Sequence, residues 1–346
     1  MTGTTSAKTN PGRFFEDYSV GKVIAHAVPR TVKMGERALY HALYPARHAL
    51  HSADTFAQSC GLPYSPLDDL VTFHTVFGKT VPDISLNAVA NLGYAEGRWI
   101  TPLWPGDTIT ATSEVIGVKE NSSGTSGVVW VRTTGRNQHG EVLLTYVRWV
   151  MVRKRGTGPA AAAVVPTLSD SVAVTDLVIP PGLDLTAYDF TLSGEPHRLR
   201  DYAVGEIIDH VDGVTVEEAE HMLATRLWQN TAKVHFDATH RPDGRRLIYG
   251  GHVISIARAL SFNGLANAQM IVALNGGAHA NPCFAGDTVR AWSQVLDVAD
   301  TPAPGVGAIR LRTVATKGAA GNLRDAAGKY SPDVLLDLDY WALMPQ

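Results

Sequence analysis

The sequence predicts an α+β fold made of two divergent copies of one domain, each with a central helix wrapped by an antiparallel sheet. Asp17–Gly21 returns as Asp201–Gly205, offset by 184 residues, and Pro102–Thr108 returns as Pro282–Thr288, offset by 180 residues. Each copy also places one apolar, helix-like segment before a run of alternating segments. At 346 residues the chain is long enough for two such units, each of which we expect to bury a core of its own.

The repeats divide the chain into a first repeat over residues 12–155, a linker over 156–196 and a second repeat over 197–346. The linker is rich in Ala, Pro, Gly and Ser and has no clear period. Its apolar side chains between Leu177 and Phe190 predict that it packs against a domain. Met1–Pro11 is polar and lacks the apolar core of a signal peptide, so we expect a frayed leader there.

The first elements of each repeat follow from local signals. Short strands are expected over Val23–Val32 and Glu206–Val216. Thr215 is a candidate N-cap for the next helix, because three glutamates follow it in what would be the first turn. Apolar residues then recur with helical spacing over Asp69–Val81 and over Gly251–Leu265, which predicts the central helix of each repeat.

Three alternating segments end each copy. In the first repeat they cover Thr108–Val118, Gly127–Arg136 and Val142–Val152, and their period of two is typical of long antiparallel strands. A helix followed by such a meander predicts a sheet that curls around the helix. Two such sheets could pair side by side as one continuous surface.

Composition excludes several classes of function. The net charge is −3 and there is no dense block of Lys or Arg, so we expect neither nucleic acid nor an anionic membrane as a partner. Cys60 and Cys283 stand in non-equivalent places without metal-ligand spacing, which predicts inert thiols, no metal site and a reducing compartment. No apolar run approaches the roughly 20 residues needed to span a bilayer. We therefore expect a soluble, cytoplasmic protein.

The densest group of reactive residue types lies in the second repeat. His235 follows a polar loop, and an imidazole there can act as a general base near neutral pH when a neighbour fixes its tautomer. A structural histidine bonded to the backbone is the alternative. Gly250 and Gly251 leave a helix start bare, so their N–H groups could hold a carbonyl oxygen that gains negative charge, although a simple tight turn is the other interpretation. Together these groups suit chemistry beside a thioester.

These residues resemble the MaoC-like dehydratases, the (R)-specific enoyl-CoA hydratases, in their fused double hot-dog form. In that family a loop motif, D-x-N-P-[LIV]-H, supplies an Asp and a His that activate water, and a glycine N–H binds the thioester oxygen. Aligned on the histidine, His235 matches and Asn230 stands where the family has aspartate. The resemblance implies His235 as the base, Asn230 as the water-orienting partner, and the Gly251 N–H, possibly with that of Gly250, as the oxyanion donor.

The first repeat departs further from this motif. It keeps His51 but has Ala46 at the partner position and Asp68–Asp69 in place of the glycine pair. Fused members of the family use one copy as the binding half, so we expect the active site in the second repeat.

Further candidates concern substrate binding. Lys233 replaces the motif's proline and could pair with the extra carboxylate of a dicarboxylic acyl group, with a solvated lysine as the alternative. Arg245 and Arg246 could meet CoA phosphates, and His252 follows the glycine pair. For His279, which precedes the repeated turn, a loop role is favoured over a place in the pocket.

Overall the chain is most similar to the mesaconyl-CoA hydratase (β-methylmalyl-CoA dehydratase) branch, notably over Asp68–Arg98 and Trp130–Arg155. The resemblance implies reversible hydration of an enoyl-CoA, here mesaconyl-CoA to β-methylmalyl-CoA, without a metal or redox cofactor. It also implies a homo-oligomer, with a dimer expected. Two alternatives stay open: an acyl-CoA thioesterase on the same fold, and a non-catalytic acyl-CoA-binding protein, which the departure at Asn230 favours.

Overall fold

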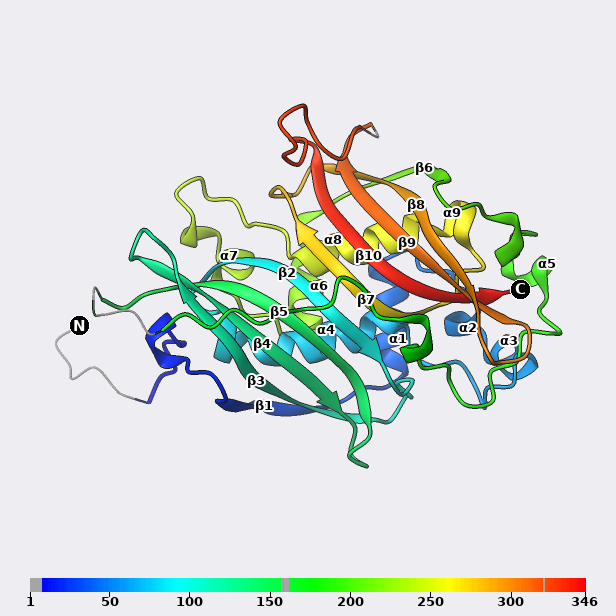
Figure 1. Cartoon of the computed structure of the whole chain (residues 1–346), viewed down its shortest axis with the longest axis horizontal. Coiled ribbons are helices and arrows are strands. Elements are labelled where there is room, and N and C mark those ends of the chain that lie inside the picture. Colours follow the sequence, from blue (N-terminus) through cyan, green and yellow to red (C-terminus); the bar gives the residue numbers. More distant parts are fainter. Residues whose placement is uncertain (1–7, 157, 159–161, 320) are drawn as a thin grey trace.

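A single antiparallel sheet of ten strands is the main structural element of the protein (Figure 1). The computed structural model describes residues 8–156, 158, 162–319 and 321–346. The strands follow the order β1-β3-β4-β5-β2-β7-β10-β9-β8-β6, so the two repeats contribute one half each. The strands of the first half are β1 (Val23–Thr31), β2 (Ala88–Trp99), β3 (Thr108–Glu120), β4 (Ser126–Arg136) and β5 (Val142–Arg153). Those of the second half are β6 (Ile207–Thr215), β7 (Met270–His279), β8 (Thr288–Asp300), β9 (Val306–Lys317) and β10 (Val334–Pro345).

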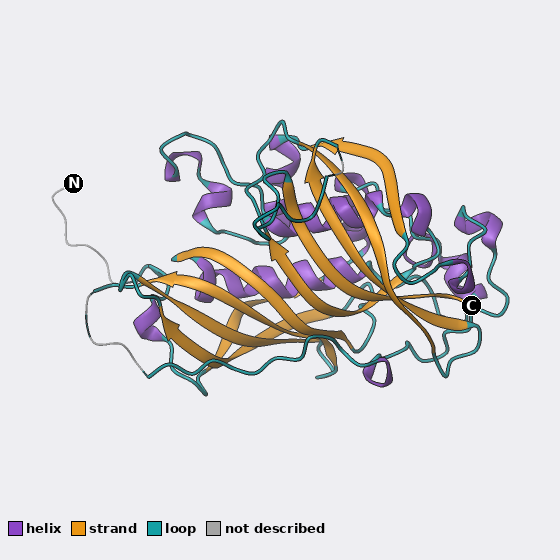
Figure 2. Cartoon of the chain, turned by 45° about the horizontal axis from the view of Figure 1, so that its top comes forward, coloured by secondary structure: helices purple, strands orange, loops and turns teal. Residues whose placement is uncertain are grey.

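Two long helices lie side by side against one face of this sheet (Figure 2). They are α4 (Asp69–Thr80), which continues into the π-helical turn η2 (Val81–Ser85), and α8 (Gly250–Leu260). The remaining α-helices are α1 (Met34–Leu43), α2 (Ala49–Ser52), α3 (Asp54–Ser59), α5 (Phe190–Ser193), α6 (Glu218–Leu227), α7 (Lys233–Phe236) and α9 (Phe262–Leu265). Among the described residues, no helix is long and apolar enough to cross a membrane.

The predicted sheet is confirmed, including the expectation that the two halves pair as one surface. The seam is an antiparallel pair of β2 and β7, with Tyr94 opposite Gly277 and Arg98 opposite Ala273. These two strands are absent from the prediction, which has four strands in each repeat. Neither has a simple alternation, because β2 carries three register shifts against β5 and β7 runs from consecutive buried residues into two glycines.

The predicted start of α6 is wrong. Thr215 belongs to β6 and its hydroxyl lies 2.8 Å from that of Thr288 on the neighbouring strand. The helix begins at Glu218, with Glu217 as its N-cap. The cross-strand pair therefore takes the hydroxyl that a cap would need. The predicted second central helix is shortened as well, because α8 ends at Leu260, and Asn263 and Gly264 inside the short α9 have non-helical backbone angles.

The expectation of two separate cores is also wrong. Every residue of α4 is buried, and so is every residue of α8 after Gly250, although both helices carry polar side chains such as His74 and Ser255. The largest hydrophobic cluster includes Val76 of α4 and Ile256 of α8, so it runs across both repeats. Polar groups also join the two helices, since His74 Nε2 lies 2.7 Å from Ser255 Oγ. The repeats therefore share their largest hydrophobic cluster, because each central helix has the other as a neighbour, while a smaller cluster that includes Phe15 and Val131 lies in the first repeat alone.

The linker packs against the protein as its apolar residues predict. Val164 forms a β-bridge with Val118, and Leu185 and Tyr188 are buried in a cluster with Trp341 of β10. The Val172 N–H donates to Asn275 Oδ1 at 2.8 Å. Residues 157 and 159–161 of the predicted linker, and residues 1–7 of the predicted leader, lie outside the described residues.

Candidate active site

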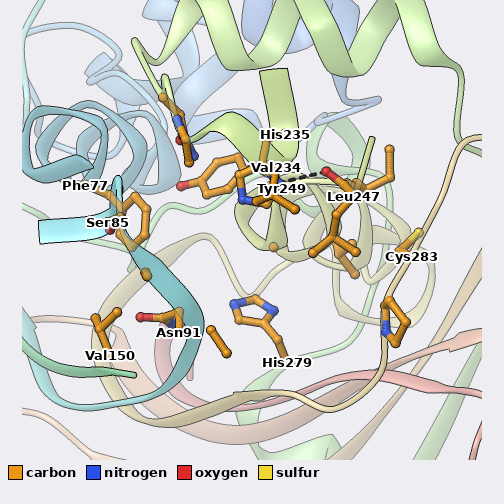
Figure 3. Close-up of a pocket in the computed structure, with 18 of the residues that line it drawn as sticks. Phe77, Ser85, Asn91, Val150, Val234, His235, Leu247, Tyr249, His279 and Cys283 are labelled. Atoms are coloured by element: carbon orange, nitrogen blue, oxygen red, sulfur yellow. Dashed lines mark hydrogen bonds between the residues drawn. The ribbon is translucent and has the colours of Figure 1, made fainter. Parts of the chain in front are cut away.

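A cavity of about 300 Å³ opens where the second repeat meets the sheet of the first (Figure 3). One wall is the loop around α7 together with the start of α8, and the opposite wall is β2 and β5. Polar side chains on the first repeat's wall are Ser85, Asn91, Tyr94 and Arg148. Those on the second repeat's wall are Asn230, His235, Tyr249, His279 and Asn281. The site is therefore built by both repeats.

His235 has the geometry of a neutral base. Its Nδ1 lies 2.7 Å from the Leu247 carbonyl oxygen, so Nδ1 carries the proton and donates, and Nε2 is left as the acceptor (Figure 3). The Leu247 N–H in turn donates to the Val234 carbonyl at 3.0 Å, which ties α7 to the segment before α8. Burial lowers the pKa of His235 to about 4. The ring is therefore uncharged at neutral pH and its tautomer is fixed by the backbone.

Asn230 lies at the same cavity on the turn that ends α6. Gln229 closes that turn with a φ of 55°, and the Asn230 N–H donates to the Thr225 carbonyl at 2.9 Å. The side-chain oxygen of Asn230 accepts from the Ala232 N–H at 3.2 Å. Because that oxygen faces the backbone, the amide NH₂ is the end that can donate to a molecule in the cavity.

Gly250 is the first residue of α8 and lines the cavity, so its N–H belongs to the unpaired first turn of the helix. A Cβ at this position would lie 2.4 Å from the His279 ring, so a larger residue would require that ring to move. Gly251 is buried behind the Tyr249 ring and does not border the cavity. Gly250 therefore borders the cavity and Gly251 does not, and the oxyanion role predicted for Gly251 stays a prediction.

The other predicted substrate-binding residues lie outside the cavity wall. Lys233 is exposed on α7, and Arg246 forms an ion pair with Glu218 at 2.9 Å. His252 is buried, with its Nδ1 3.0 Å from the Tyr44 hydroxyl. Arg245 is exposed, and its guanidinium lies 4.1 Å from the centre of the Phe284 ring, beside the cavity residue Cys283.

The corresponding place in the first repeat is closed. His51 Nδ1 lies 3.4 Å from the Pro66 carbonyl, as His235 does with Leu247, but its Nε2 lies 3.3 Å from a carboxylate oxygen of Asp69. Burial alone would lower the pKa of His51, and the Asp69 carboxylate raises it above its usual value. The same oxygen accepts from the Ile271 N–H at 2.7 Å. Asp69 therefore fills the position that Gly250 leaves open, and only about 10 Å³ of space lined mainly by apolar side chains remains near Leu70.

Sequence reasoning missed the first repeat's contribution to the site. Arg148 had a detectable signal, since it is the one charged residue on the inward face of β5 between Tyr146 and Val152. Asn91 and Tyr94 had no detectable signal in the sequence, because β2 was not predicted. His279 is a strand residue that lines the cavity, and its Nε2 lies 3.2 Å from the Tyr94 hydroxyl across the seam. The favoured loop role of His279 is therefore wrong.

Cys283 borders the cavity but is not set up as a nucleophile. Burial raises the pKa of its thiol to about 12, so the thiolate is scarce at neutral pH. Within the described part of the chain, no group of three or more Cys, His, Asp or Glu side chains is placed to hold a metal ion.

A sequence profile of the mesaconyl-CoA hydratase family matches residues 4–322. The chain belongs to this family. A mesaconyl-CoA hydratase from Cereibacter sphaeroides is 75% identical over 342 residues, which cover 98% of this chain and all of that protein. A β-methylmalyl-CoA dehydratase from Chloroflexus aurantiacus is 56% identical over 351 residues, covering 99% of each chain.

Solved structures extend the likeness to the fold. A MaoC domain protein dehydratase from Chloroflexus aurantiacus superimposes with a TM-score of 0.96 at 56% identity, covering 99% of both chains. A double hot-dog protein from Mycobacterium tuberculosis gives a TM-score of 0.73 at 22% identity over 96% of this chain and 98% of the other. The predicted double hot-dog fold and the predicted family are therefore confirmed.

Proposed function

We propose that this protein catalyses the reversible hydration of mesaconyl-CoA to β-methylmalyl-CoA. The observation that carries the proposal is the family match along nearly the whole chain, together with a neutral, oriented His235 in a cavity of about 300 Å³. Hydration places a hydroxyl on the β-carbon of the enoyl thioester and a proton on the α-carbon. It needs one group to take a proton from water and another to hold the thioester oxygen.

In our mechanism His235 Nε2 accepts a proton from a water molecule, and the oxygen of that water bonds to the β-carbon. The electron pair of the double bond moves through the α-carbon onto the thioester oxygen, where the Gly250 N–H stabilises the negative charge. The imidazolium then returns its proton to the α-carbon, so His235 ends neutral. Asn230 donates its amide N–H to the water and orients it, which an amide can do although it cannot take the proton.

CoA would approach from the Cys283 side of the cavity. Arg245 stands there over the Phe284 ring and is exposed, so it is the better placed of the two predicted arginines to meet a phosphate. Arg246 has Glu218 as its partner already. We also propose a cytoplasmic location, which two buried, unpaired cysteines support, and a homodimer, to be measured by light scattering after gel filtration.

Incubation with mesaconyl-CoA, followed by mass spectrometry, tests the function. We expect a product that has gained one water and still carries CoA, with a fall in the absorbance of the conjugated thioester. Release of free CoA would instead indicate a thioesterase, and binding without any change of mass would indicate a non-catalytic acyl-CoA-binding protein.

A further inference from the structure

The cavity holds a positive charge that the proposed chemistry does not use. Arg148 on β5 is 1% exposed, and it is the only permanently charged side chain among the described residues that line the cavity. Its described partners are hydroxyls: Nη2 donates to Thr80 Oγ1 at 2.7 Å, and both Nη atoms lie 3.2 Å from Ser85 Oγ. Its Nε has no hydrogen-bond partner within the described chain. No carboxylate of the described residues forms an ion pair with Arg148. A buried charge without a counter-ion is costly, which indicates an anion that binds from outside.

A second unpaired polar group lies beside it. Both amide atoms of Asn91 are buried and lack a hydrogen-bond partner among the described residues, although Asn91 lines the cavity. The register of β2 and β5 pairs Tyr94 with Arg148 and Asn91 with Val150, so these side chains stand on neighbouring strands at one end of the site. Figure 3 shows Asn91 and Ser85 on the side of the cavity away from Cys283.

The repeat offers an internal comparison. Val131 pairs with Arg148, and its repeat equivalent Leu311 pairs with Tyr340, so Tyr340 takes the place of Arg148 in the second half-sheet. Tyr340 borders the closed space of about 10 Å³, and its hydroxyl lies 3.1 Å from that of Thr313. The arginine thus occurs at the open cavity and is replaced at the closed one. A general need of the fold does not explain it.

We propose that Arg148, with Asn91 and Ser85, binds the free carboxylate of the acyl group and so selects dicarboxylic over monocarboxylic enoyl-CoA esters. This inference rests on the proposed function. In mesaconyl-CoA the free carboxylate is attached to the carbon that receives the hydroxyl, at the opposite end of the double bond from the thioester. Arg148 lies 4.4 Å from the Phe77 ring centre, and Figure 3 shows Phe77 and Ser85 at one end of the cavity and Cys283 at the other.

This assignment differs from the predicted role of Lys233, which is exposed and outside the cavity wall. The assignment also gives the positive charge of Arg148 a role in the reaction. A carboxylate on the β-carbon repels an incoming hydroxyl oxygen, and an arginine that neutralises it removes this repulsion. A planar guanidinium also fixes the plane of the carboxylate, which positions the adjacent carbon for attack.

The test compares kcat/KM for mesaconyl-CoA and for crotonyl-CoA, which lacks the carboxylate, in the wild type and in Arg148→Met. We expect the wild type to prefer mesaconyl-CoA. In Arg148→Met, kcat/KM should fall by about 100-fold or more for mesaconyl-CoA, as expected on truncating one partner of a buried charge pair, and by less than about threefold for crotonyl-CoA. Competitive inhibition by succinyl-CoA and butyryl-CoA gives the same comparison without turnover.

Arg132→Met is the matched control, because Arg132 lies on the neighbouring strand β4, is 39% exposed in its side chain and pairs with Glu96. It should leave the preference unchanged. Arg148→Lys and Asn91→Ala keep the test open if Arg148→Met does not fold, and each should lower the preference by roughly tenfold. An equal loss for both substrates would show that Arg148 only holds Thr80 and Ser85, and would overturn the inference. A wild type that hydrates neither ester would contradict the proposed function instead.

Discussion

The sharpest prediction concerns His235→Asn. The asparagine amide can keep donating to the Leu247 carbonyl, which His235 Nδ1 contacts at 2.7 Å, but it has no nitrogen at the position of Nε2. The substitution therefore removes the base and keeps the contact that holds the loop. General-base catalysis contributes about 100-fold to 10,000-fold in rate, or roughly 3 to 5 kcal/mol of activation free energy, so kcat should fall by at least about 100-fold.

The assay follows the absorbance of the conjugated thioester at saturating mesaconyl-CoA, with the thermal midpoint of each variant measured in parallel. In the wild type, kcat/KM should stay nearly constant as the pH is lowered from 8 to about 5, because burial lowers the pKa of His235 to about 4. A histidine in water would instead lose its basic form near pH 6.5. If His235→Asn folds normally and retains more than a tenth of the wild-type kcat, His235 is not the base and the mechanism fails.

Three further predictions concern the surroundings of the site. Gly250→Ala should lower kcat by about tenfold or more, because the added Cβ would lie 2.4 Å from the His279 ring. Gly276→Ala is the control and should leave kcat unchanged, because the space around its Cβ is open. Equal kcat values for the two variants would contradict the role of the bare helix start. His51→Gln should leave kcat within about twofold of the wild type but lower the thermal midpoint, since the buried Asp69 carboxylate loses the His51 imidazole as its ion-pair partner. A large loss of kcat would refute the interpretation that the first repeat's site is closed. Burial lowers the pKa of six histidines, His235 among them, to about 3 or 4. Between pH 6.5 and 4 the unfolded chain therefore binds more protons than the folded chain, so the free energy of unfolding should fall as the pH falls, by up to about 1.4 kcal/mol per pH unit for each such histidine. Urea titrations at pH 7, 6 and 5 that coincide would disprove this.

Much of the architecture is local information. The repeated turns at Pro102 and Pro282 reveal two related domains, and the period of two in Val142–Val152 predicts β5 to within one residue. Alternation and helical spacing depend only on neighbours along the chain, so they can be recognised without a structure. His235 and the glycine pair can be recognised for the same reason, because a polar loop and the start of a helix are both indicated by neighbouring residues in the sequence.

What the sequence by itself determined is the fold of each repeat and the position of His235, the residue that we propose as the general base. The tertiary structure alone decided how the repeats join, because the β2–β7 seam depends on strands whose alternation is broken by register shifts and glycines. It also decided the composition of the cavity, since Arg148 and His235 come from different repeats and meet only across that seam. That Gly250 borders the cavity and Gly251 does not also depends on packing, because Gly251 lies behind the Tyr249 ring, and a side-chain packing arrangement of that kind leaves no periodic trace along the chain.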